Sequence, residues 1–219
     1  MLGIFKDKEG KSLYLINGSL FIMLGIVFYL VVRGIVIVIR YKRRKLVYLL
    51  KEIIGFLFVI YICMVVSVTL FPFPIGFNTN IENVYRSINM IPLKSIIDNI
   101  SQIGIAYDGD VLFMIGLIVK NVGGNILLLM PLGFLAPILR DKFKKFKSVM
   151  LLGFSVSISI EILQFLENFA GGWGRITDID DVICNVLGAI IGYFIYKLFF
   201  KIVDKFKIKT FKKLNFRNY

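Results

Sequence analysis

Five long apolar stretches constrain this chain more than any other feature of its sequence. Each one approaches or exceeds the roughly 20 residues that a helix needs to cross the hydrocarbon core of a bilayer. They cover residues 17–39, 53–71, 111–139, 148–168 and 179–200. Hydrophobic residues make up 58% of the chain and the mean hydropathy is +0.80, which is too apolar for one soluble domain. The sequence therefore predicts an all-α integral membrane bundle of about five transmembrane helices.

The basic residues lie mainly in short runs between these stretches. The runs are residues 40–45, residues 140–147 and the tail 201–219, and all three fall on one side of a five-span topology. The positive-inside bias makes that side cytoplasmic and places the N-terminus outside, which Lys6, Lys8 and Lys11 weakly oppose. Anionic lipid headgroups also account for the net charge of +13, so we expect no nucleic-acid partner.

The same pattern divides the chain into three parts. Residues 1–52 form an N-terminal transmembrane helix with a basic cytoplasmic loop, residues 53–200 a transmembrane domain, and residues 201–219 a basic cytoplasmic tail. In the outer loop between the second and third spans, isoleucines between positions 88 and 103 are interspersed with polar residues. This pattern predicts a short helix, which either lies in the outer interface or packs as a cap on the bundle.

The chain contains no histidine, and this excludes several kinds of site. Ser-His and Cys-His catalysis and every histidine-ligated metal site are ruled out. Cys63 and Cys184 both lie inside predicted spans, where they are expected to be small apolar packing residues.

Polar residues recur at helical spacing in the last three spans. On the fifth span one face carries Asp178, Asp181, Asn185, Gly188 and Gly192. On the fourth span a matching face carries Ser157, Glu161, Gln164 and Asn168, and the third span adds Asn121 and Asn125. In the predicted topology these faces converge in the outer half of the bundle. Gly188 and Gly192 form a pair of small residues that allows close approach of another helix.

Each of these polar residues also has a purely structural interpretation. Thr177 and Asp180 match a capping box, and Asp178 is well placed for the dipole of its own helix. Glu161 is either a site residue or the partner of Arg175 in a salt bridge. The asparagines and Gln164 either bind a ligand or join helices by hydrogen bonds.

Several motifs, in a consistent order, resemble those of the VanZ-like family. The resemblance covers roughly residues 53–200, and Leu93 stands where that family often has phenylalanine. It implies a bacterial integral membrane protein associated with resistance to the glycopeptide antibiotic teicoplanin, without a defined role for any residue. The motifs are Thr69-Leu70-Phe71, residues 89–93, residues 125–134, residues 161–164, and residues 175–185 followed by Leu187-Gly188-Ala189.

These observations support one main functional hypothesis and two alternatives. The main hypothesis is a protein of the bacterial cell membrane that binds or modifies an envelope lipid, a lipid-linked cell-wall precursor or the glycopeptide at the outer face, alone or as a homo-oligomer. The alternatives are a small ion-coupled transporter and a scaffold for an envelope enzyme. An enzymatic version would use the carboxylates as acid and base or as ligands for Mg²⁺ or Mn²⁺. The sequence does not decide between these two roles, so it identifies no cofactor. The candidate catalytic residues are Glu161, Asp178 and Asp181, and the candidate substrate-binding residues are Arg175, Asn125, Gln164 and Asn185.

Overall fold

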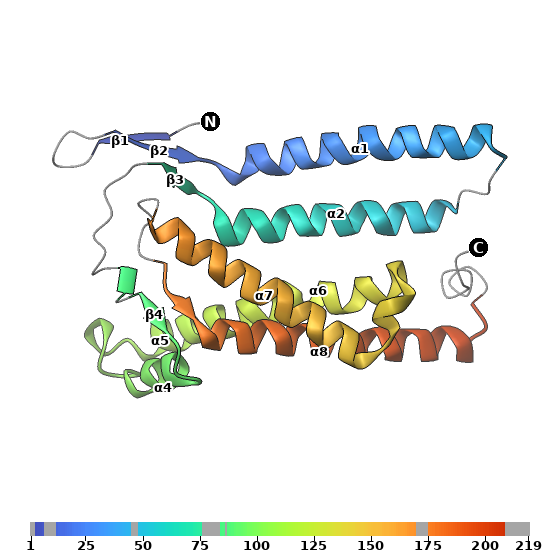
Figure 1. Ribbon diagram of the computed structural model, residues 1–219. Helices are drawn as coiled ribbons and strands as arrows, with labels where there is room; N and C mark the ends of the chain where they lie inside the picture. The colour runs from blue at the N-terminus through green and yellow to red at the C-terminus, as the bar shows by residue number, and fades with distance from the viewer. Residues whose placement is uncertain are drawn as a thin grey trace.

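The chain folds as a bundle of five long apolar helices (Figure 1). A computed structural model describes residues 3–6, 12–44, 48–75, 84–85, 87–169 and 175–208. All five candidate spans are helical, which confirms the predicted all-α membrane bundle. The long helices are α1 (Gly18–Lys42), α2 (Leu49–Leu70), a third span made of α5 (Val111–Ile118), η2 (Val119–Gly123) and α6 (Gly124–Leu139), then α7 (Phe146–Phe169) and α8 (Ile179–Lys205).

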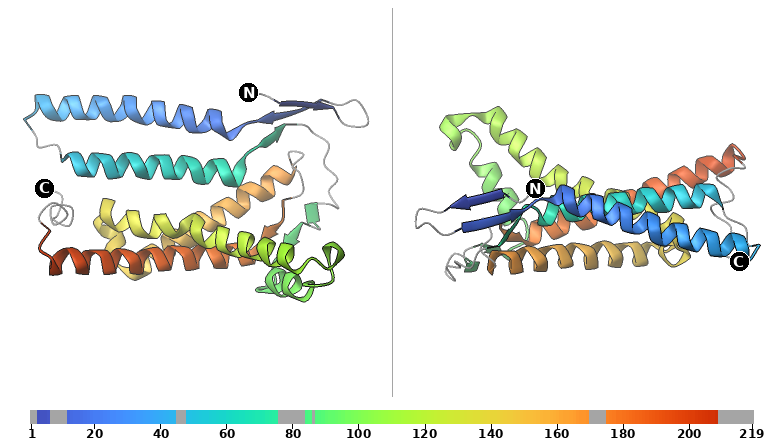
Figure 2. Two further views of the ribbon diagram at one scale, coloured as in Figure 1. Left: turned by 180° about the vertical axis from the view of Figure 1, so that it is seen from behind. Right: turned by 90° about the horizontal axis from the view of Figure 1, so that it is seen from above.

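Short elements gather at one end of this bundle, and the basic connections lie at the other. Figures 1 and 2 show the α1–α2 connection, the α6–α7 connection and the C-terminal end of α8 at the same end, as the charge pattern predicts. The 3₁₀ turn η3 (Asp141–Lys144) forms part of the α6–α7 connection. Of the predicted basic tail, residues 209–219 lie outside the described residues.

Two small sheets occupy the opposite end, and the sequence patterns did not indicate them. An antiparallel sheet joins β1 (Gly3–Lys6), β2 (Ser12–Ile16) and β3 (Phe73–Ile75). A parallel pair joins β4 (Ile88–Asn89) to β5 (Thr177–Asp178), with Asn89 opposite Asp178. The second pair ties the outer loop directly to the start of α8.

The short helix predicted in the outer loop is present as α4 (Lys94–Ser101), followed by the turn η1 (Tyr107–Gly109). It contacts α5 and α8, yet Ile97 and Ile100 are 59% and 53% exposed. Both predicted alternatives therefore describe part of its behaviour. The helix packs on the bundle through one side and presents isoleucines outward on another.

The tightest packing in the bundle is between α6 and α8. The two helices run in the same direction, and their backbones touch where glycines leave room. A methyl group on Gly188 would overlap the carbonyl of Ile126, one on Gly192 would overlap the carbonyl of Met130, and one on Gly133 would overlap the carbonyl of Ala189. This contact confirms the close approach predicted from Gly188 and Gly192.

The α1–α2 hairpin forms a more loosely attached layer. Inside it, Arg33 donates two hydrogen bonds to the Glu52 carboxylate, at 2.5 and 2.7 Å, so the two charges in these apolar helices neutralise each other. The Tyr61 hydroxyl donates to the carbonyl oxygen of Leu128 at 2.6 Å and joins α2 to α6. Cys63 and Cys184 are both buried free thiols.

The α6–α8 contact predicts a sharp difference between glycine positions. Gly188→Ala should lower the free energy of unfolding by about 3 kcal/mol, because the new methyl group meets backbone atoms that cannot rotate away. Gly34→Ala on α1 is the matched control, since a methyl group there would meet no atom within 4 Å. Thermal unfolding of the purified proteins in detergent measures the stability of both variants against the wild type. Equal stability of the two variants would contradict the packing described here.

Candidate functional site

The predicted site residues lie at the end of the bundle that is opposite the basic connections. Asp178 is the N-cap of α8, and its carboxylate accepts a hydrogen bond from the Asp180 amide at 2.9 Å. The same oxygen also accepts from the Asn89 side chain at 2.9 Å, and the Asp178 amide donates to Glu161 Oε2 at 3.0 Å. Asp178 therefore joins the outer loop, α7 and α8, and its buried carboxylate is occupied by structural bonds.

Asp180 caps a helix other than its own. Its carboxylate accepts hydrogen bonds from the backbone amides of Leu93 and Ile96, the latter at 3.2 Å, at the start of α4. Leu93, the N-cap residue of α4, has no side-chain acceptor for these amides. The expected capping box of Thr177 and Asp180 is wrong, because Asp178 is the N-cap and Asp180 stabilises α4 instead.

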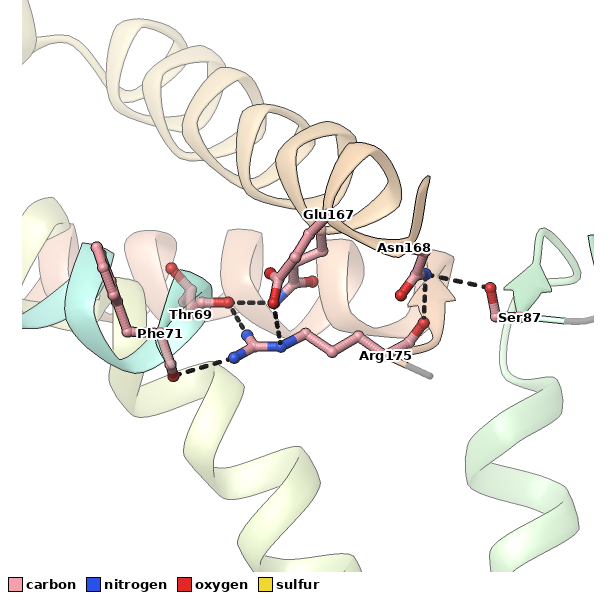
Figure 3. Close-up of polar contacts among 7 residues, drawn as sticks. Thr69, Phe71, Ser87, Glu167, Asn168 and Arg175 are labelled. Atoms are coloured by element: carbon pink, nitrogen blue, oxygen red, sulfur yellow. Dashed lines mark hydrogen bonds and ion pairs between the residues drawn. The ribbon is translucent and has the colours of Figure 1, made fainter. Parts of the chain in front are cut away.

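Arg175 binds the C-terminal end of α2 (Figure 3). Nη1 donates to the carbonyl oxygen of Thr69, and Nη2 donates to that of Phe71 at 3.0 Å. The last carbonyls of a helix have no partners within it and carry partial negative charge, which suits a guanidinium. Gln164 Nε2 also donates to the Thr69 carbonyl, at 3.0 Å. Two of the expected substrate-binding residues thus join the end of α2 to α7 and to the segment just before β5.

The counter-charge of Arg175 is Glu167, whose Oε1 lies 3.6 Å from Nε (Figure 3). The salt bridge between Arg175 and Glu161 that the sequence left open is therefore not formed. Next to this pair, Asn168 donates to the Arg175 carbonyl at 2.7 Å and to the Ser87 hydroxyl at 3.2 Å. These contacts fix the Arg175 backbone as well as its side chain.

The remaining candidates meet between α6, α7 and α8, and we call them the polar cluster: Glu161, Asp181, Asn125, Asn185 and Ser157. The Asn125 amide donates to Asp181 Oδ1 at 2.5 Å, and the Asn185 amide donates to the Ser157 hydroxyl at 3.0 Å. Asn185 is only 1% exposed, and its Oδ1 has no hydrogen-bond partner. Glu161 lies close enough to Asp178 and Asp181 to interact with both electrostatically. Within the described part of the chain, neither Glu161 nor Asp181 forms an ion pair.

The chemistry of the polar cluster is that of hydrogen-bond acceptors in an apolar bundle. Carboxylate and amide oxygens suit hydroxyl and ammonium donors. Among the described residues, the three acids Glu161, Asp178 and Asp181 do not form a group that could hold a metal ion.

Three residues with structural roles at this end were not among the candidates. Asn89 bonds Asp178 and also donates to the Ser95 hydroxyl at 2.8 Å, Ser87 accepts from Asn168, and Glu167 pairs with Arg175. Asn89 lies in the motif at residues 89–93 and could have been selected from it. Ser87 and Glu167 carry no spacing signal, since their roles depend on contacts between distant segments.

Removing one acceptor from the start of α4 should loosen that helix without unfolding the bundle. In Asp180→Asn one of the two amides, Leu93 or Ile96, loses its charged partner, so hydrogen exchange of the α4 amides should accelerate by about tenfold. Exchange detected by mass spectrometry measures this. Asp98→Asn, the same change at an exposed position of α4, should leave exchange unchanged. Unaltered exchange in Asp180→Asn would contradict the capping role.

Arg175→Met should destabilise the protein mainly because it leaves the buried Glu167 carboxylate without its cation. Glu167 is 2% exposed and would lose its cation, so the free energy of unfolding should fall by about 2 kcal/mol, a value reduced for the partial exposure of Arg175. Glu167→Gln in the same chain should restore part of this loss. A double-mutant cycle by thermal unfolding tests the pair, and strictly additive effects would show that it contributes nothing.

Comparison with known proteins agrees with the resemblance seen in the motifs. No match is found among the curated proteins or among the solved structures. The family profile described as VanZ/LLP1 matches residues 58–200, which is most of the chain and includes the polar cluster, Arg175 and α4. The chain therefore belongs to the VanZ-like family, whose known association is with resistance to the glycopeptide teicoplanin, and it is a multi-pass membrane protein.

Proposed function

We propose that this protein binds the polar headgroup of an envelope lipid or lipid-linked cell-wall precursor, and thereby lowers susceptibility to glycopeptides such as teicoplanin. The observation that carries the proposal is the polar cluster inside an otherwise apolar bundle. Ionisable groups within membrane spans are costly and are commonly retained for function. Glu161 and Asp181 have no cationic partner among the described residues, and Asn185 Oδ1 has no donor.

The orientation of the bundle in the membrane is part of the same proposal. The basic ends of α1, α6 and α8 lie together and would face the cytoplasm under the positive-inside rule. The polar cluster then lies in the outer half of the bilayer. Headgroups of the outer leaflet and of exported cell-wall precursors are found at that level, where glycopeptides act.

The residues divide into two groups in this proposal. Glu161, Asp181, Asn125 and Asn185 contact the headgroup, and their oxygens accept hydrogen bonds from its hydroxyl or amino groups. Arg175 and Gln164 hold the end of α2 and so define one wall of the site. Asp178 and Asp180 hold the outer loop in place.

The proposal predicts that neutralising the polar cluster abolishes both binding and protection. In a susceptible bacterial host, the wild type should raise the teicoplanin concentration that inhibits growth, whereas Glu161→Gln and Asp181→Asn should return it to the vector level. The two changes keep side-chain size and remove charge-assisted hydrogen bonds, so headgroup affinity should fall by about tenfold or more. Lipids that co-purify with each variant, identified by mass spectrometry, give the direct readout.

Asp98→Asn is the control, because it makes the same chemical change at an exposed position outside the polar cluster. It should retain full protection. All variants are compared at equal membrane levels. Full protection by both cluster variants would exclude a binding role for these carboxylates and favour a scaffold. A chemically altered precursor found with the wild type alone would replace simple binding by catalysis.

A further inference from the structure

We infer that Lys120 binds the phosphate group of a lipid-borne ligand on the membrane-facing side of the polar cluster. The inference rests on the proposed function and adds to it the chemical class of the ligand. Lys120 is an exposed residue of η2, the π-helical turn between α5 and α6 in the third span. Such turns are rare and are often found at functional sites.

The depth of Lys120 places its ammonium group near the headgroup region. Asn125 on the third span bonds Asp181, the third residue of α8, so it lies near the outer end of both helices. Lys120 precedes Asn125 by five residues, so its backbone lies roughly 7 Å closer to the outer interface. The lysine side chain can extend from there toward the interface.

Lys120 has no anion within the protein to neutralise it. Among the described residues its ammonium group forms neither an ion pair nor a hydrogen bond. Arg33 and Arg175, which also lie within or beside the spans, each have a carboxylate partner. An ammonium group at the level of the lipid headgroups is stabilised by an external anion.

The surface beside Lys120 has room for a ligand. Gly116 and Gly124 lie four residues before it and four after it, so they lie close to its helix face. A methyl group added to either glycine would meet no atom within 4 Å. Lys120 therefore lies between two glycines on an unobstructed surface of the third span, which we call the strip.

This strip adjoins the polar cluster. The turn η2 contacts α8, and it is followed within two residues by Asn125, which bonds Asp181. At the same end, α5 diverges from the other long helices (Figure 2). A ligand lying along η2 can present its hydroxyl or amino groups to the polar cluster and its anionic group to Lys120.

Phosphate is the anion that fits this position. Lysine binds phosphate as a compact point charge, and phosphate is the anionic group that lipids carry at the level its ammonium group reaches. The ligand would thus combine a phosphate with a hydroxyl- or amine-bearing group.

Titration calorimetry in a neutral maltoside detergent tests the inference with three probes: dioctanoyl phosphatidic acid, dioctanoylglycerol carrying a glucose headgroup, and inorganic phosphate. Lys120→Met should weaken phosphatidic acid binding by about ten- to a hundredfold and leave glucolipid binding within about twofold. Lys120→Arg should keep phosphatidic acid binding within about threefold. Lys94→Met is the control, because Lys94 is an exposed lysine of α4 outside the spans and should have no effect.

Three results would overturn the inference. Unchanged phosphatidic acid binding in Lys120→Met would show that the ammonium group contacts no phosphate. Equal weakening of both lipids would show a structural role for Lys120. Inorganic phosphate bound as tightly as phosphatidic acid would show that the ligand is not lipid-borne.

A fourth variant separates this inference from the proposed function. Asp181→Asn should weaken glucolipid binding. If it does not, while Lys120→Met still weakens phosphatidic acid binding, the headgroup proposal fails and the phosphate site stands. If Asp181→Asn weakens glucolipid binding and Lys120→Met changes nothing, the headgroup proposal stands and the phosphate inference fails.

Discussion

The backbone contact between α6 and α8 is the interaction on which the rest of the structure depends. Between transmembrane helices the hydrophobic effect contributes little, because lipid chains are as apolar as leucine side chains. Close packing and hydrogen bonds have to hold the helices together instead. Gly133, Gly188 and Gly192 allow two backbones to touch, and Ala189 between them is completely buried. The same pairing holds Asn125 within hydrogen-bond distance of Asp181, so the position of the polar cluster follows from the position of the glycines.

The absence of water in the hydrocarbon core also explains why the four acids at this end have different hydrogen-bond partners. A buried carboxylate must find donors, and the available donors at this end are backbone amides freed at helix starts. Asp178 accepts from the start of α8 and Asp180 from the start of α4. Glu161 accepts from the Asp178 amide, and Asp181 accepts from a neutral side chain. Asp178 and Asp180 therefore satisfy backbone amides of the fold. Glu161 and Asp181 have no cation beside them among the described residues, which is why we place the ligand there.

The sequence predicted what depends on periodicity and missed what depends on contacts between distant segments. Helix length and hydropathy suffice for five spans, and the three- and four-residue spacing correctly brought Gly188 and Gly192 to one helix face. Spacing within one segment could not show that Asp180 caps a helix 84 residues earlier in the chain. Nor could it show that Arg175 pairs with Glu167 rather than Glu161, since both glutamates lie on the same helix and only the path of the chain between α7 and α8 decides between them.

The arrangement of these structural residues bears on how a ligand reaches the polar cluster. Toward α2, Arg175 and Gln164 both bond the Thr69 carbonyl and close that side with protein contacts. Toward the bundle end, Asp178 and Asp180 hold β4 and α4 against α8. Along η2, the glycines of the third span leave open space, and Lys120 beside them is exposed. In the proposed function, approach along this surface of the span is less obstructed than approach through the outer loop. For the proposed function, this difference favours a lipid-borne headgroup over the glycopeptide itself as the ligand, because the antibiotic would have to arrive through the face that the outer loop covers.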